Sequence, residues 1–215
     1  MKRSFLIIFA MVILLGSTSF GRPMQSIELV VNGGFGLPAG PAIFIDRAKL
    51  GYNFGGGLSY TINHRFSVDL LFDYNRFQFD RFSYAQSIGR PVDQDVPDTY
   101  IIEGGPSEVI SIALQGRWYM FPGASDVLPY LLGGAGYMSF AADVVYHGNT
   151  IEALIGDPAD PGFEQDALYS AIGLGFDFPR SDRIVLFIEG RYSLGFTDER
   201  IFQYFPFKLG FRFVI

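Results

Sequence analysis

The sequence predicts an all-β fold, an eight-stranded antiparallel up-and-down transmembrane β-barrel. Its 215 residues are 17% aromatic and 18% charged and include 26 Gly, a composition that favours strands over helices. Apolar and polar residues alternate with a period of two in eight segments, as they do in strands that present two different faces. The connections alternate between short and long, which is the layout of an outer-membrane barrel.

The eight segments are separated by two kinds of connection. We expect strands at 26–37, 48–62, 66–80, 108–121, 128–146, 167–178, 184–197 and 203–215. Short turns at 63–65, 122–127 and 179–183 are expected on the periplasmic side, and the connections at 38–47, 81–107, 147–166 and 198–201 on the outside. In the third segment, Leu70 and Phe72 share one face, whereas Asp69 and Asp73 share the other.

The apolar face of each strand is expected to contact lipid, while the Gly, Ala and Ser of the opposite face fit a narrow lumen. Closure of the sheet removes unpaired edges, which hydrocarbon does not tolerate. The last segment therefore is expected to pair with the first as an assembly strand, with an outward face of Phe207, Leu209, Phe211, Phe213 and Ile215. A shift by one residue would turn Lys208 and Arg212 toward lipid, at about 2–4 kcal/mol each near the midplane.

Aromatic residues near the strand ends predict two interfacial girdles. The periplasmic girdle is expected to contain Tyr60, Phe66, Trp118, Phe121 and Tyr130, and the outer girdle Phe35, Phe77, Phe140 and Phe196. Their rings would lie at the height of the lipid headgroups.

Ionisable residues on the opposite face predict a charged lumen. They are Glu28, Asp69, Asp73, Asp177 and Glu189, with Lys49, Arg117, Arg191, Lys208 and Arg212. Because unpaired buried charge is very costly, five acids beside five bases indicate a salt-bridged plug; a proton relay or a catalytic role is the alternative. An eight-stranded barrel holds only its own side chains or one small ligand, which argues against a general porin.

The first residues have the pattern of an export signal. Lys2 and Arg3 precede an apolar run from Phe5 to Leu15, and small residues follow up to Gly21. This run is too short for a spanning helix, which needs about 20 residues. We expect 1–21 to be a cleaved signal peptide, 22–215 to be the barrel domain, and the protein to reach the bacterial outer membrane.

Charge and cysteine content exclude several classes of function. A net charge of −6 and a pI of about 4.8 argue against a nucleic-acid partner. The chain has no Cys, which removes disulfide scaffolds, thiol catalysis and Cys-based metal sites. The acidic stretch after His147 is expected to be a solvated loop; a calcium site is the alternative, although the spacing lacks the EF-hand pattern. We expect no metal site and no cofactor.

His147 is the candidate catalytic residue. It stands at the outer end of the fifth segment, in "YHGN", where the simplest interpretation is a polar residue at the barrel rim. The alternative is acid–base chemistry by His147 with Glu152 or Asp157 of the following loop.

On its alternation, turn pattern and terminal strand, the chain resembles the small eight-stranded outer-membrane barrels of the OmpA transmembrane-domain and OmpX type over residues 24–215. That resemblance implies a non-enzymatic protein whose surface loops serve adhesion, host interaction or envelope integrity. It implies outer-membrane lipid, lipopolysaccharide and the barrel-assembly machinery as partners, and leaves the partner of the loops open. The chain ends in Ile215, whereas such barrels usually end in Phe.

A lipid A-modifying enzyme centred on His147 is the second hypothesis, and a narrow channel is the third. Lipid A deacylases of the PagL type carry a His-x-Ser pattern, but here Gly148 and Asn149 follow His147. This departure argues against a Ser-based triad.

Overall fold

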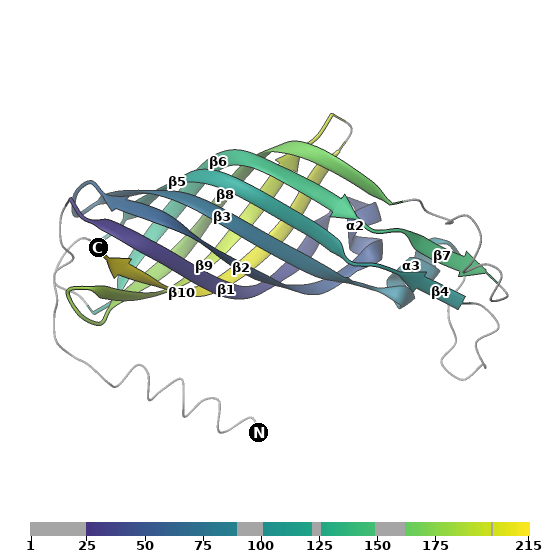
Figure 1. Cartoon of the computed structure of the whole chain (residues 1–215), viewed down its shortest axis with the longest axis horizontal. Helices are drawn as coiled ribbons and strands as arrows, with labels where there is room; N and C mark the ends of the chain where they lie inside the picture. Colours follow the sequence, from purple (N-terminus) through teal and green to yellow (C-terminus); the bar gives the residue numbers. More distant parts are fainter. Residues whose placement is uncertain (1–24, 90–100, 122–125, 149–161, 199) are drawn as a thin grey trace, which may run out of the picture.

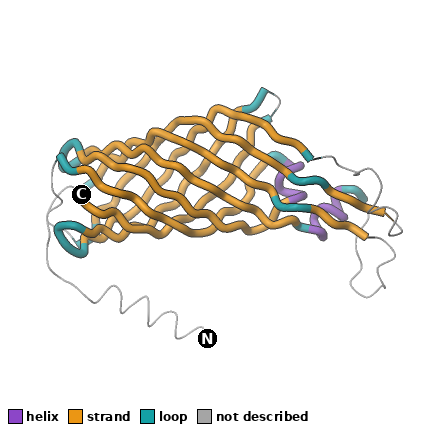
Figure 2. Tube along the Cα trace, in the orientation of Figure 1, coloured by secondary structure: helices purple, strands orange, loops and turns teal. Residues whose placement is uncertain are grey.

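The computed structural model describes residues 25–89, 101–121, 126–148, 162–198 and 200–215, so the expected signal peptide lies outside the described residues. Eight antiparallel strands close into a barrel in the order β1-β10-β9-β8-β6-β5-β3-β2, as Figures 1 and 2 show. The strands are β1 (Ile27–Gly40), β2 (Ala48–Thr61), β3 (Phe66–Phe79), β5 (Ser107–Tyr119), β6 (Leu128–Ala142), β8 (Phe163–Pro179), β9 (Ile184–Phe196) and β10 (Ile201–Val214). The predicted fold class is confirmed.

The first and last barrel strands pair directly, as the sequence predicts. Their register runs from Glu28 opposite Val214 to Gly40 opposite Gln203. The Ile215 N–H donates to the carbonyl of Ile27 at 2.9 Å, which extends the pairing to the last residue. The barrel therefore has no open edge whose backbone groups would face hydrocarbon unpaired.

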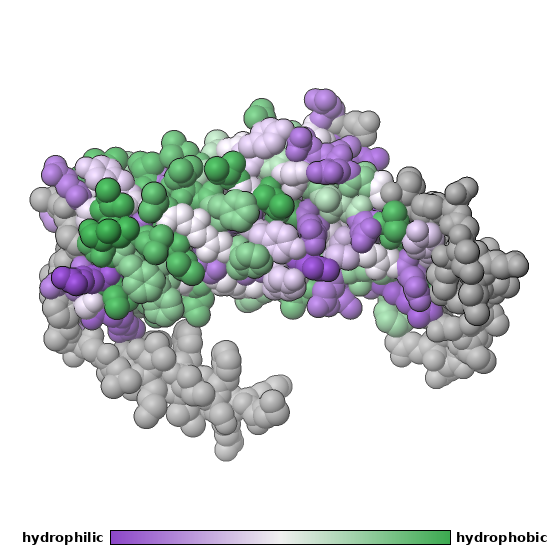
Figure 3. Space-filling model, viewed as in Figure 1, coloured by the Kyte–Doolittle hydropathy of each residue, from purple (hydrophilic) through white to green (hydrophobic). Residues whose placement is uncertain are grey.

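The barrel wall separates an apolar outside from a polar inside. On β3, Leu70 and Phe72 are 50% and 48% exposed, whereas Asp69 and Asp73 are 1% and 4% exposed. Figure 3 shows apolar side chains spread over the wall on the face in view. Since every strand of the wall presents exposed apolar side chains, this surface suits a lipid environment rather than water.

The prediction of an interfacial girdle is wrong for three of its aromatic residues, because they face the lumen. Phe77, Tyr130 and Phe140 are at most 1% exposed. Strand parity decides their direction: Tyr130 shares a face with the buried Leu128 and Leu132. The remaining expected girdle residues, Phe35, Tyr60, Phe66, Trp118, Phe121 and Phe196, are exposed on the wall or at its end.

Beyond the barrel strands, the described residues of the outer end form four short elements that the sequence did not predict. They are α2 (Ala42–Arg47), α3 (Arg81–Ser87) and the antiparallel pair β4 (Ile101–Gly104) and β7 (Val145–Gly148), at the end of the barrel away from the C-terminus in Figure 1. The segment predicted as one strand at 128–146 is divided, because β6 ends at Ala142. In addition, β8 begins at Phe163, within the predicted loop 147–166.

We call α3, β4 and β7 the outer extension. It has a small core of its own, made of Tyr84, Ala85, Ile102 and Val145, against which Phe79 packs. The Asp80 carboxylate caps α3 by accepting the N–H groups of Phe82 and Ser83 at 3.1 and 3.2 Å. Helices this short show no periodicity in the sequence, which is why they escaped prediction. Among the described residues, no helix is long and apolar enough to span a membrane.

Candidate functional site

The inner face of the wall brings the predicted charges together. Nine of the ten residues are buried, each at most 4% exposed: Glu28, Asp69, Asp73, Arg117, Asp177, Glu189, Arg191, Lys208 and Arg212. We call these nine residues the charge network. Several of its ion pairs join strands that are not neighbours in the wall, such as Arg117 with Asp177 and Arg191 with Asp73, so the network crosses the interior of the barrel.

Lys49 is the exception, and the prediction that it faces the lumen is wrong. The pairing of β2 with β3 shifts register between Ala48 and Gly51, and this irregularity leaves Lys49 exposed. Arg47, at the end of α2, is buried instead, at 3% exposed, and its guanidinium donates to the carbonyl of Asp143 near the outer mouth. An alternation argument cannot find such a shift, because a bulge changes the face of every residue beyond it.

Arg117 is the centre of the periplasmic half of the charge network. Its Nε and Nη2 atoms donate to the two carboxylate oxygens of Asp69, both at 2.8 Å. Its Nη1 atom lies 3.4 Å from Asp177 Oδ2, and Nη2 also donates to the Ser59 hydroxyl at 2.6 Å. This bidentate geometry fixes β3 to β5 and points the remaining donor across the lumen.

Arg212 links this centre to the next acid. It forms an ion pair with Asp177 and donates to the Tyr130 hydroxyl at 3.2 Å. The Tyr130 hydroxyl in turn donates to Glu189 Oε2 at 3.0 Å. The guanidinium carbon lies 3.9 Å from the centroid of the Phe187 ring, so a cation–π contact adds to the pairing.

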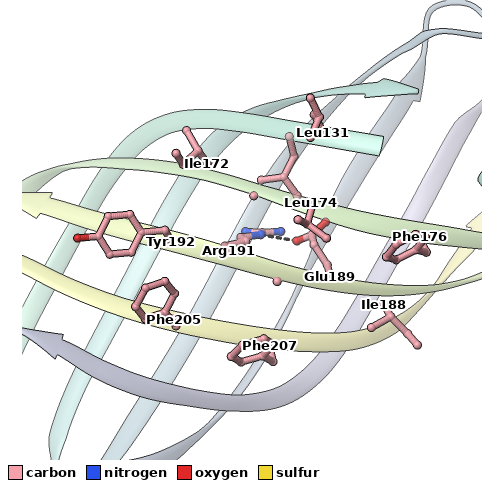
Figure 4. Close-up of a pocket in the computed structure, with 13 residues that line it drawn as sticks. Leu131, Ile172, Leu174, Phe176, Ile188, Glu189, Arg191, Tyr192, Phe205 and Phe207 are labelled. Atoms are coloured by element: carbon pink, nitrogen blue, oxygen red, sulfur yellow. Dashed lines mark hydrogen bonds and ion pairs between the residues drawn. The ribbon is translucent and has the colours of Figure 1, made fainter. Parts of the chain in front are cut away.

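Arg191 and Lys208 complete the charge network toward the middle of the barrel. Arg191 forms an ion pair with Glu189, seen behind the wall in Figure 4, and donates to Asp73 Oδ2 at 3.1 Å. The Lys208 ammonium pairs with the same Asp73 oxygen. Each of the four cations of the charge network thus contacts at least one carboxylate, an arrangement that neutralises buried charge.

An aromatic seal lies above the charge network, toward the outer mouth. Phe44 of α2 inserts between Phe77 and Phe140, with ring centroids 5.0 Å from each in edge-to-face geometry. Phe140 stacks on Phe202 at 4.1 Å. The four rings are at most 1% exposed. This insertion was not predicted from the sequence. The signal that could have indicated it is the apolar stretch "AIFID" within the predicted loop 38–47.

A layer of amides separates the seal from the charge network. On β3 the successive inward residues are Asp73, Asn75 and Phe77, which belong to the network, the layer and the seal in turn. Asn53 stands opposite Asn75 in register and donates to the carbonyl of Phe35 at 2.8 Å. The side chain of Asn32, 6% exposed, has no hydrogen-bond partner within the described protein.

The backbone of His147 lies in β7, opposite Ile102, outside the barrel wall. Glu152 and Asp157, its expected partners, fall outside the described residues. Among the residues that the structure describes, no group of three or more His, Cys, Asp or Glu could hold a metal ion.

Comparison with known proteins places the fold. No family model matches the chain. No curated protein matches it by sequence. Among solved structures, Neisserial surface protein A has a TM-score of 0.56 at 13% identity, covering 88% of this chain and 97% of that one. OprG, an outer-membrane protein from Pseudomonas aeruginosa, has a TM-score of 0.50 at 13% identity, covering 91% and 99%.

The chain has the fold of the small eight-stranded outer-membrane barrels, and the resemblance predicted from its sequence is confirmed at the level of fold. At these identities the likeness extends to architecture alone, so the function has to be argued from this chain's own residues.

Proposed function

We propose that the protein is a non-enzymatic outer-membrane barrel that serves in adhesion or host contact through its outer surface. The observation that carries this proposal is the outer extension. It builds a second small core beyond the barrel, although the barrel needs no such core to close. Ordered elements on a rigid scaffold are a common basis of recognition.

The exposed side chains of the outer end support recognition. Phe82 and Ile88, at the start and the end of α3, are 55% and 36% exposed, and Ile45 of α2 is 43% exposed. Apolar groups presented on helices beyond the strands offer the anchors that protein interfaces use.

The filled lumen argues against the channel hypothesis. The charge network and the aromatic seal occupy successive levels of the interior, and their largest side chains are almost fully buried. A path for ions would require both levels to open at once. The enzyme hypothesis has no specific observation in its favour, because its expected partners Glu152 and Asp157 fall outside the described residues.

For its partners, we propose that outer-membrane lipid and lipopolysaccharide surround the wall and that the barrel-assembly machinery recognises β10. The outward residues Phe207, Leu209, Phe211, Phe213 and Ile215 form the exposed apolar row that such recognition would use. Export by cleavage of residues 1–21 belongs to the same proposal.

To test the role of the outer surface, two variants with acidic substitutions are each expressed in cells from which the chromosomal gene has been deleted, and the adherence of these cells is measured. Val145→Asp places a charge in the extension core, where Val145 is fully buried, whereas Gln86→Asp adds the same charge at an exposed position of α3. Val145→Asp should lower adherence to host cells or extracellular matrix at least fivefold, and Gln86→Asp should not. Both proteins should keep the heat-modifiable mobility of a folded barrel. Unchanged adherence with increased detergent sensitivity would instead assign the protein to envelope integrity.

A further inference from the structure

We propose that the outer wall over β8, β9 and β10 carries a groove that binds one fatty acyl chain of lipid A. The proposal rests on the outer-membrane location proposed above but is independent of adhesion. The groove has a volume of about 720 Å³, within the range of about 300–1,000 Å³ typical of small-molecule sites. Figure 4 shows its lining of Leu131, Ile172, Leu174, Phe176, Ile188, Tyr192, Phe205 and Phe207.

The groove exists because one outward position of β9 has no side chain. Gly190 lies between Ile188 and Tyr192 on the outward face, opposite Leu174 on β8 and Phe207 on β10. A Cβ atom at Gly190 would lie 3.4 Å from the ring of Phe207, so larger side chains would fill the space directly. The aromatic and aliphatic side chains of the neighbouring residues therefore form the rims of the groove, and the backbone at Gly190 forms its floor.

The charge network fixes the floor of this groove. Glu189 and Arg191, on either side of Gly190, point inward and form an ion pair, which Figure 4 shows behind the floor. At Gly173 the backbone of β8 lies close to that of β9. Only glycine permits this approach, because a Cβ atom at this position would collide with the carbonyl of Gly190. A rigid, concave apolar surface holds an acyl chain in one place, whereas a smooth wall allows lipid to exchange freely.

The depth of the groove identifies the leaflet. A rise of about 3.4 Å per residue and a tilt of about 40° advance a strand by about 2.6 Å per residue along the membrane normal. Ile188 then lies about 10 Å, and Tyr192 about 21 Å, above Ile184 at the periplasmic end, in an apolar band about 25 Å tall. The groove is therefore centred at Gly190, about 16 Å above the periplasmic end and so in the outer half of the band, where the chains of lipid A reside.

The upper end of the groove has the chemistry of a lipid linkage region. The Tyr192 hydroxyl donates to Gln203 Oε1 at 2.6 Å, and both residues face outward. Gln203 lies ten residues from Phe213 on β10, hence about 26 Å above the periplasmic end by the same rise and tilt. Its amide N–H groups suit the ester and amide carbonyls of an acylated glucosamine. The apolar groove below this polar pair matches a chain that hangs from such a linkage.

The test measures lipid retention by native mass spectrometry of the refolded full-length protein, incubated with purified lipid A or with phosphatidylethanolamine. The wild-type protein should retain one lipid A. Gly190→Leu should reduce the retained fraction at least fivefold, and Tyr192→Phe at least twofold. Gly33→Leu is the matched control, since Gly33 faces outward on β1 outside the groove and its Cβ would meet only Asn53 O at 3.6 Å; its retention should equal wild type.

Equal retention of lipid A by the wild type and Gly190→Leu would overturn the proposal. Retention of phosphatidylethanolamine equal to that of lipid A would do the same, as would a protein dimer that Gly190→Leu disrupts, since the groove would then bind a second copy. Heat-modifiable mobility checks that each variant is folded. If Gly190→Leu fails to fold, Tyr192→Phe decides, and wild-type retention in that variant refutes the site. Two outcomes separate the lipid proposal from the adhesion proposal. If Gly190→Leu loses lipid A while cells that carry it adhere normally, the groove binds lipid and adhesion does not depend on it. If Gly190→Leu retains lipid A as the wild type does while Val145→Asp abolishes adherence, the lipid proposal is refuted and only the adhesion proposal remains.

Discussion

Removal of Arg117 should be the most damaging single change in the charge network. Arg117→Met takes away the bidentate partner of Asp69 and one of the two arginines at Asp177. Breaking a buried pair by removing one partner costs about 3–5 kcal/mol, because the other charge stays buried without compensation. Since Arg212 still pairs with Asp177, we expect the cost to arise mainly at Asp69.

A double-mutant cycle isolates this cost. Asp69→Asn should also destabilise the barrel, but the double variant Arg117→Met/Asp69→Asn should cost at least 2 kcal/mol less than the sum of the singles, an amount within the usual range for groups in direct contact. Urea unfolding in lipid vesicles measures the free energy of unfolding through Trp118, the one Trp of the chain, which is 40% exposed on the outer wall.

The control is Lys49→Met, which removes a cation at an exposed position of β2. Its effect should stay within about 0.5 kcal/mol, as for other surface substitutions. Additive costs in the cycle, or a loss from Lys49→Met equal to that from Arg117→Met, would refute the network as the structure describes it.

Three further predictions concern the seal, the assembly strand and His147. Phe44→Ala removes the ring that joins Phe77 to Phe140 and should cost about 3–5 kcal/mol, yet planar-bilayer recordings should stay free of steady conductance because the charge network still fills the lumen; stable steps in the wild type would contradict the filled interior. Phe211→Arg should lower the heat-modifiable folded fraction, whereas Val214→Thr should be nearly silent. Phe211 lies about 5 Å above the periplasmic end of the wall, so the cost of its charge in lipid should be smaller than the about 2–4 kcal/mol of the midplane. Equal damage would contradict the assignment of faces. His147→Ala should leave the lipid A mass profile of the cell unchanged, and a His147-dependent shift in acyl mass would favour the enzyme hypothesis instead.

The sequence by itself determined the number of barrel strands, the faces of most of their residues and the closure of the barrel. Alternation is a local property: Phe72 and Asp73 have to face opposite ways in any strand, whatever the strand pairs with. The cost of charge in lipid then decides which face is outside, and the cost of an unpaired strand edge in hydrocarbon requires that the first and last strands pair. These arguments need no knowledge of distant contacts, so they reached the inward direction of Arg117, Arg191 and Arg212.

Only the tertiary structure decided which inward groups meet. Arg117 contacts both Asp69 and Asp177, which are far apart in sequence, because the stagger of the strands sets their heights within the lumen. The same pairing places Gly190 beside Phe207, and the fold of the connection before β2 brings Phe44 between Phe77 and Phe140. The register shift near Lys49 likewise depends on pairing with β3. Alternation defines the side of the wall on which a residue lies, but its neighbours depend on long-range register, which no local pattern encodes.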